Sequence, residues 1–66
     1  MTQFWEYLVV TNDGRRWQTD LVPADLSLQN GCNEIARDGW ELVSVAVGGG
    51  SRYFTLFFKR PRQGLD

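Results

Sequence analysis

The chain has 66 residues and a formal net charge of −1, with seven basic and eight acidic side chains. This length accommodates one domain, and the near-neutral charge argues against a protein whose whole surface binds nucleic acid or an anionic membrane. The sequence contains no apolar run of about 18 residues, and its first residues lack the basic start of a secretory signal. We therefore expect no membrane association and a cytoplasmic location.

The only cysteine, Cys32, cannot form an intrachain disulfide, and a chain without histidine lacks the usual zinc ligands. We expect a reduced protein with no metal and no other cofactor. Domains this short bury only a modest share of their surface, so stability must come from close packing or from a partner.

Two strands and a turn are predicted in the first third of the chain. Aromatic and β-branched residues favour a strand over 4–10, and Asn-Asp-Gly at 12–14 is typical of a turn. Apolar and polar residues then alternate, which predicts a second strand over 16–22. Pro23 ends it, because proline cannot donate a hydrogen bond to a sheet.

A helix is predicted next, with Asp25 or Ser27 as its N-cap and Gly39 as its C-cap. Gly31 inside the helix costs about 1 kcal/mol relative to alanine, so it either permits a close approach to the sheet or weakens the first turn. The residues at positions i, i+4, i+7 and i+8 form one apolar stripe: Leu28, Cys32, Ile35 and Ala36.

The clearest strands cover 40–47 and 52–60, and the glycine-rich segment 48–51 joins them as a hairpin loop. The element order is therefore ββαββ, with no internal repeat. We predict an α+β fold with a four-stranded antiparallel sheet of order 2-1-3-4 and one helix on one face. The single domain covers 1–60, and 61–66 is a flexible C-terminal tail.

Apolar side chains occupy both faces of this predicted sheet, because alternate residues of a strand point to opposite sides. One helix covers one face, and the other face keeps a larger apolar patch than soluble monomers usually expose. We expect a homo-oligomer that packs sheet on sheet or joins edge to edge. A monomer whose aromatic side chains cover one another, and an obligate different partner, are the alternatives. The residues proposed for the oligomer interface are Phe4, Leu8, Val10, Val43, Val45, Phe54, Leu56 and Phe58.

The segment NEIARDGWELVSV at 33–45 follows an aromatic strand, WEYLVV at 5–10, and precedes a strand that ends in FKRP at 58–61. These motifs resemble a small bacterial and phage family catalogued as domain of unknown function 4177. The resemblance extends over most of the chain, implies a compact α+β domain and brings no established activity or cofactor. The departures from the family pattern are Asp38, where the family often has glutamate, and Gly31 and Cys32 in the helix.

The GWELV motif has a structural explanation. Gly39 can turn the chain out of the helix, and Trp40 can cover the junction between helix and sheet. Leu42 or Val43 can then enter the core. We prefer this interpretation to a binding role for Trp40.

Catalytic chemistry has little support in the sequence. We interpret Cys32 as a buried packing residue, and Asp38 and Glu41 as solvated charges near the helix end. The glycines at 48–50 lack the lysine and the following helix of a phosphate-binding loop. We therefore predict that the protein is no enzyme but a small interaction module of unknown client, self-associating through its sheet surface.

The alternative function is weak binding of single-stranded nucleic acid or of a small anionic ligand. Basic and aromatic residues interleave over 52–66, and an aromatic sheet face can stack unpaired bases. An edge strand protected by terminal charges explains the same pattern, and we prefer it. A small-ligand pocket between protomers, reached by Arg15, Arg16 or Arg52, is a third hypothesis. The candidate anion or nucleic-acid contacts are Arg52, Lys59, Arg60 and Arg62.

Overall fold

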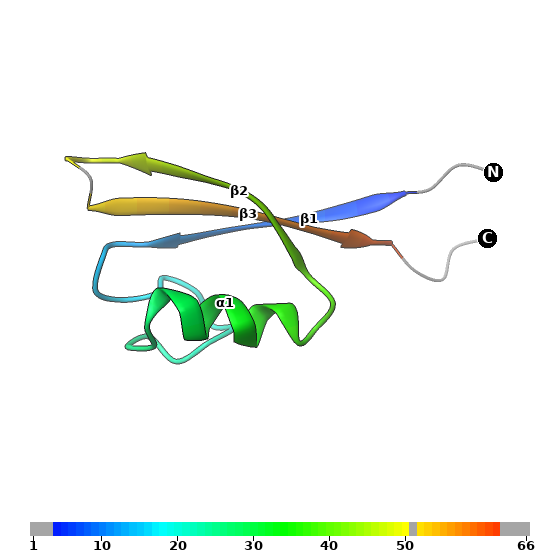
Figure 1. Cartoon of the computed structure of the whole chain (residues 1–66), viewed down its shortest axis with the longest axis horizontal. Coiled ribbons are helices and arrows are strands. Elements are labelled where there is room, and N and C mark those ends of the chain that lie inside the picture. Colours follow the sequence, from blue (N-terminus) through cyan, green and yellow to red (C-terminus); the bar gives the residue numbers. More distant parts are fainter. Residues whose placement is uncertain (1–3, 51, 63–66) are drawn as a thin grey trace.

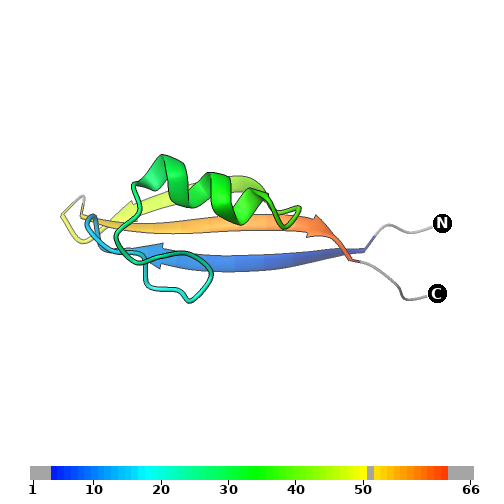
Figure 2. The same ribbon diagram turned by 90° about the horizontal axis from the view of Figure 1, so that it is seen from below.

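The computed structural model describes residues 4–50 and 52–62, which form three strands and one helix (Figure 1). The sheet has the strand order β1-β3-β2, and both hydrogen-bonded strand pairs are antiparallel. The helix and the loop before it lie on one side of the sheet, as Figure 1 and Figure 2 show. The elements are β1 (Trp5–Asn12), α1 (Leu28–Ala36), β2 (Glu41–Gly48) and β3 (Tyr53–Pro61).

The predicted strand over 16–22 is wrong, and so is the four-stranded sheet of order 2-1-3-4. Within this segment only Trp17 forms a bridge, an isolated one to Asn12 at the end of β1. The Trp17 backbone N–H donates instead to the Ala24 C=O at 2.8 Å, which closes a loop. The segment thus bonds to itself and to the end of β1 rather than adding a strand to the sheet.

The loss of this strand changes the connectivity of the sheet. β3, the last strand in the chain, lies in the middle, so β1 and β2 are the two edges. Both run antiparallel to β3 and therefore run in the same direction as each other. Two strands with the same direction need a crossover connection, and α1 with its flanking loops supplies it.

The N-terminal end of α1 is confirmed where the sequence predicted it, but the predicted C-cap Gly39 is wrong: the helix ends at Ala36, Arg37 is its C-cap, and Gly39 lies in the turn that follows. Ser27 is the N-cap, and its side chain accepts a hydrogen bond from the Asn30 N–H at 3.1 Å. After the helix, the Gly39 N–H donates to the Ala36 C=O at 2.9 Å, and Gly39 has a φ of +90°. Glycine adopts this left-handed conformation without steric cost, so Gly39 can complete the turn from the helix end into β2.

Gly31 brings α1 into direct contact with the indole ring of Trp17. A Cβ atom at Gly31 would overlap with the Cε2 and Cζ2 atoms of that ring. The indole Nε1–H donates to the Leu26 C=O at 3.0 Å, which fixes the ring beside the first turn. A glycine is therefore needed at position 31 because α1 approaches another element closely. That element is the loop that carries Trp17, whereas the sequence predicted a close approach to the sheet.

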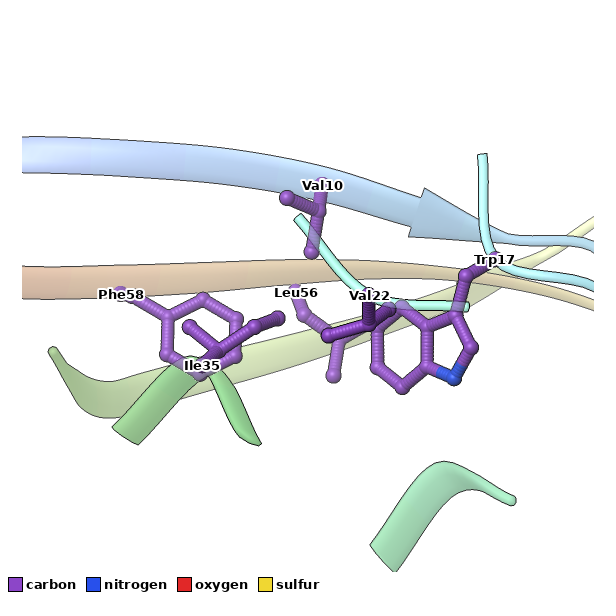
Figure 3. Close-up of a cluster of buried hydrophobic side chains, with 6 residues drawn as sticks. All are labelled: Val10, Trp17, Val22, Ile35, Leu56 and Phe58. Atoms are coloured by element: carbon purple, nitrogen blue, oxygen red, sulfur yellow. The ribbon is translucent and has the colours of Figure 1, made fainter. Parts of the chain in front are cut away.

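The core lies between the sheet and the layer formed by α1 and the loop before it (Figure 3). Two of its members, Trp17 and Val22, come from the segment that was predicted to be a strand. This segment therefore contributes to the core as a loop. The buried core residues are Val10, Trp17, Val22, Ile35, Leu56 and Phe58.

The register of β2 against β3 shifts between Leu42 and Ser44, which places a bulge at Val43. Leu42 therefore shares the helix-covered face with Val45, whereas simple alternation predicted opposite faces. Leu42 and Val43 are both exposed, so the prediction that one of them enters the core is wrong.

The predicted tail over 61–66 is only partly within the described residues. Pro61 is the last residue of β3, and the Arg62 N–H donates to the Phe4 C=O at 2.9 Å. Both residues thus continue the folded part of the chain. Residues 63–66 lie outside the described residues.

Candidate interaction surface

The sheet face opposite α1 carries aromatic and aliphatic side chains from all three strands. Residues directly opposite each other in neighbouring strands project from the same face, so the register identifies this set. Val9 lies opposite Phe57, and Tyr7 lies opposite Lys59. We call this surface the open face; its residues are Trp5, Tyr7, Val9, Thr11, Glu41, Ser44, Ala46, Tyr53, Thr55, Phe57 and Lys59.

Large apolar side chains of the open face remain in contact with solvent. Tyr7 is 69% exposed and Val9 is 55% exposed, and Phe57 is still 36% exposed although it lies in the central strand. Trp5 and Tyr53 are exposed as well. Burial of each aromatic side chain removes about 150–250 Å² of accessible surface from water. The apolar side chains of this face are therefore large enough to form an interface.

The charges of the open face balance. Lys59 and Glu41 are its charged residues, and they lie opposite each other in β3 and β2. The Lys59 Nζ also lies 4.4 Å from the centroid of the Trp5 ring, in a cation–π contact. A neutral face of this kind suits an apolar partner better than a polyanion, which binds to clustered basic groups.

The structure separates the eight residues that the sequence predicted for an oligomer interface. α1 and its preceding loop cover the face to which most of them belong. Five are buried or half-buried on that face: Leu8, Val10, Phe54, Leu56 and Phe58. Three are exposed: Phe4, Val43 and Val45. A second copy cannot reach the buried members while the fold is intact, so the uncovered apolar face is the opposite one.

Arg60 joins β1, β3 and the corner between α1 and β2. Its Nε donates to the Glu6 carboxylate at 2.6 Å, and its Nη1 donates to the Asp38 C=O at 2.8 Å. The guanidinium carbon lies 4.1 Å from the centroid of the Trp40 ring. These contacts engage the guanidinium within the chain, so Arg60 serves the fold rather than an external anion.

The four predicted anion contacts do not form one cluster, although Arg60 and Arg62 line the same hollow together with Glu6 and Asp38. Arg52 precedes β3 and Lys59 lies near its other end, roughly 24 Å away at about 3.4 Å per residue. Lys59 and Arg60 project from opposite faces and already contact Trp5 and Trp40.

Two of the three arginines suggested for a small-ligand pocket line the same hollow. Arg15 and Arg52 line an open hollow of about 590 Å³, together with Asp13. The Asp13 carboxylate accepts hydrogen bonds from the N–H groups of Arg15 at 2.9 Å and Arg16 at 2.8 Å. These bonds lower the pKa of Asp13, so the hollow contains a stable negative charge that offsets part of the positive one.

Within residues 4–50 and 52–62, no three Cys, Asp or Glu side chains lie close enough to hold a metal ion. In the same residues, no helix is long and apolar enough to cross a membrane. Cys32 is half-buried, and burial raises the pKa of its thiol, which reduces the thiolate fraction at neutral pH.

Replacement of Arg60 by alanine is expected to lower the free energy of unfolding by about 1–3 kcal/mol. An ion pair, a hydrogen bond to a carbonyl and a cation–π contact are lost together, although partial exposure weakens the ion pair. Urea unfolding followed by tryptophan fluorescence measures the change. Arg60→Lys keeps the charge and is expected to restore only part of the loss, because one ammonium group cannot reproduce the planar geometry. An unchanged unfolding midpoint for Arg60→Ala would contradict this account.

A family model described as "Domain of unknown function (DUF4177)" matches residues 5–61. The match includes the aromatic first strand, the GWELV motif and the last strand, so the resemblance seen in the sequence is confirmed. Neither the curated proteins nor the solved structures contain a match.

Proposed function

We propose that this chain, which belongs to the family described as a domain of unknown function, DUF4177, is a non-enzymatic module that self-associates through its open face. The observation that carries the proposal is the exposure of Tyr7 and Val9 in β1 and of Phe57 beside them in the central strand β3. A single helix and one loop cover the opposite face, and a second copy would supply the missing layer on this one.

A second copy fits this surface because of its charge. A two-fold interface brings the same patch of both copies together, and a patch with one sign of charge would repel itself. Lys59 and Glu41 have opposite signs, and the chain has a net charge of only −1. Two such faces can pack about 10 Å apart with their side chains interleaved.

Binding of nucleic acid or of small anions has less support. The basic residues are divided between two ends and two faces of the sheet, and Arg60 is engaged by Glu6 and Asp38. A cytoplasmic location in a bacterial or phage-infected cell is also part of the proposal. The free thiol of Cys32 is compatible with a reducing compartment.

Val9→Lys is expected to weaken self-association about tenfold or more, because it places an unpaired charge on the open face directly beside Phe57. Val9 is already exposed, so the fold should tolerate the change. Sedimentation velocity from micromolar to millimolar concentration measures the association. Leu21→Lys, at a similarly exposed loop position, is the matched control and should behave like the unchanged chain.

A chain that stays monomeric at millimolar concentration would refute the proposal, as would a Val9→Lys variant that associates unchanged. Titration of a fluorescent single-stranded oligonucleotide at low salt tests the alternative. Binding that Lys59→Gln abolishes, without any self-association, would favour nucleic acid over a second copy.

A further inference from the structure

β2 forms an unprotected edge of the sheet. Within the described residues it pairs with β3 alone, and all eight of its residues are exposed. Its sequence, ELVSVAVG, contains no lysine and no proline, which commonly prevent edge strands from pairing with other chains. Its one charged residue, Glu41, stands at the beginning of the strand.

The other edge of the sheet differs from this one. At the end of β1, Asn12 forms a bridge with Trp17, and the Gln18 N–H donates to the Thr11 C=O at 2.9 Å. The loop thus occupies hydrogen-bonding groups of β1 that would otherwise be open to another strand. β2 has no such cover in the described residues.

An apolar groove of about 280 Å³ runs beside this edge, between α1 and β2. Leu28, Cys32, Leu42 and Val45 line it. Val45 is 43% exposed and Val47 is 56% exposed, although both lie opposite core-facing residues of β3. α1 therefore leaves the β2 side of the core layer open.

We propose that β2 pairs antiparallel with β2 of a second copy, and that this second copy also covers the groove. The proposed centre is Ala46, which then lies opposite the partner's Ala46. In that register Val45 meets the partner's Val47 on the helix-covered face. The small residues Ser44 and Gly48 meet on the other face, where they leave the open face unobstructed.

The same register suits the charges and the bulge of β2. The pairing extends over 44–48, and Glu41 lies outside it, so no like charges are brought opposite each other. The bulge at Val43 interrupts the regular ladder just before the paired segment. A pairing of limited length, centred on a two-fold axis, follows from these features.

The size of the contact indicates a weak pairing. The paired segment 44–48 is about 17 Å long at about 3.4 Å per residue. Contact along it, across strand and helix layers that together measure roughly 20 Å, removes on the order of 350 Å² from each copy. The total of about 700 Å² lies in the range of weak, transient interfaces.

This proposal goes beyond association through the open face, since it uses a different surface. The two-fold axis of edge pairing is perpendicular to the sheet, whereas that of face pairing lies parallel to it. A chain that uses both surfaces can close into an assembly of four copies. The mass of the assembly therefore reports on each surface separately.

Sedimentation equilibrium of four chains tests the proposal: the unchanged chain, Val9→Lys, Val47→Lys and the double variant. With both surfaces in use, we expect four times the 7.6 kDa of one chain, two copies for each single variant, and monomers for the double variant. A Val47→Lys variant with the mass of the unchanged chain overturns edge pairing. If Val47→Lys gives monomers and Val9→Lys changes nothing, edge pairing stands and the open-face proposal fails.

A cysteine at the proposed two-fold centre gives a second readout. Opposed Cα atoms in an antiparallel pair lie about 4.5–5.5 Å apart, within the range of a disulfide bond. In a Cys32→Ser background, Ala46→Cys is expected to form a disulfide-linked dimer under mild oxidation. The matched control is Leu21→Cys in the same background. Ala46→Cys that crosslinks no faster than this control contradicts the pairing.

Discussion

Gly31→Ala is expected to destabilise the chain by up to about 2 kcal/mol, although alanine is the better helix former. On helix propensity alone, the substitution would stabilise α1 by about 1 kcal/mol. The opposite sign is expected because the new methyl group would overlap with the Trp17 indole. Overpacking of a filled core site costs about 1–3 kcal/mol.

Trp17 cannot easily move away from this methyl group. Its ring is buried, and its Nε1–H is held by the Leu26 C=O. A shift of the ring would break that hydrogen bond or disturb its packing against Val22 and the rest of the core. The alternative is a displacement of α1 itself, which would separate Ile35 from the sheet.

Urea unfolding of the two chains at equal concentration measures this effect. Gly48→Ala is the control, since nothing lies within 4 Å of the added Cβ there. In a Trp17→Leu background, Gly31→Ala should lose most of its cost, because the two positions are in contact and their effects are not additive. A Gly31→Ala chain that unfolds at higher urea than the original would show that Trp17 adapts.

The sequence located the three strands and the helix because each has a local signal. Ser27 begins α1 through its own hydrogen bond, and Gly39 turns the chain just after the helix end through its backbone conformation, and both depend on neighbours in the chain. The strands are recognisable from their aromatic and β-branched composition. Boundaries differ from the prediction by one residue at the start of β2 and by two at the end of β1, which extends to Asn12.

The error over 16–22 has a non-local cause. Trp17 and Leu21 alternate with polar residues as they would in a strand, and that pattern contains no sign of a loop. The decisive contact is that of Trp17 with Gly31, fourteen positions further along the sequence. An isolated glycine within a predicted helix was the one local hint, because it indicates close approach.

The covered face of the sheet also could not be predicted from composition. In β1, Val10 is buried, and so is the polar Asn12 beside it on the same face, while the apolar Val9 is exposed. Asn12 can be buried because its side-chain oxygen accepts a hydrogen bond from the Gly14 N–H at 2.7 Å. Hydrophobicity therefore does not show which of the two sheet faces is covered. As a result, most residues of the predicted interface lie on the face that α1 covers.

Substitutions of two neighbouring phenylalanines of β3 distinguish an effect on fold stability from an effect on self-association. Phe58 projects toward α1 and is 1% exposed, whereas Phe57 projects from the open face. Phe58→Ala is expected to cost about 3–5 kcal/mol. The single core of a chain of 66 residues rarely supplies more than about 3–5 kcal/mol, so this variant should be largely unfolded.

Phe57→Ala is expected to leave the dilute monomer folded, with a loss on the order of 1 kcal/mol, because solvent already reaches its ring. Its main effect should appear at high concentration. Association that buries Phe57 makes the unfolding midpoint rise with protein concentration, and the substitution should flatten that dependence.

Urea unfolding at low and high protein concentration distinguishes these expectations for the two variants. Phe58→Ala should be largely unfolded at both concentrations, since Ile35 and Leu56 lose a packing partner whatever the state of assembly. If Phe57→Ala unfolds the dilute chain as fully as Phe58→Ala does, the ring supports the fold rather than an interface. If instead the midpoint of Phe57→Ala rises with concentration as steeply as that of the original chain, the ring lies outside the contact between copies.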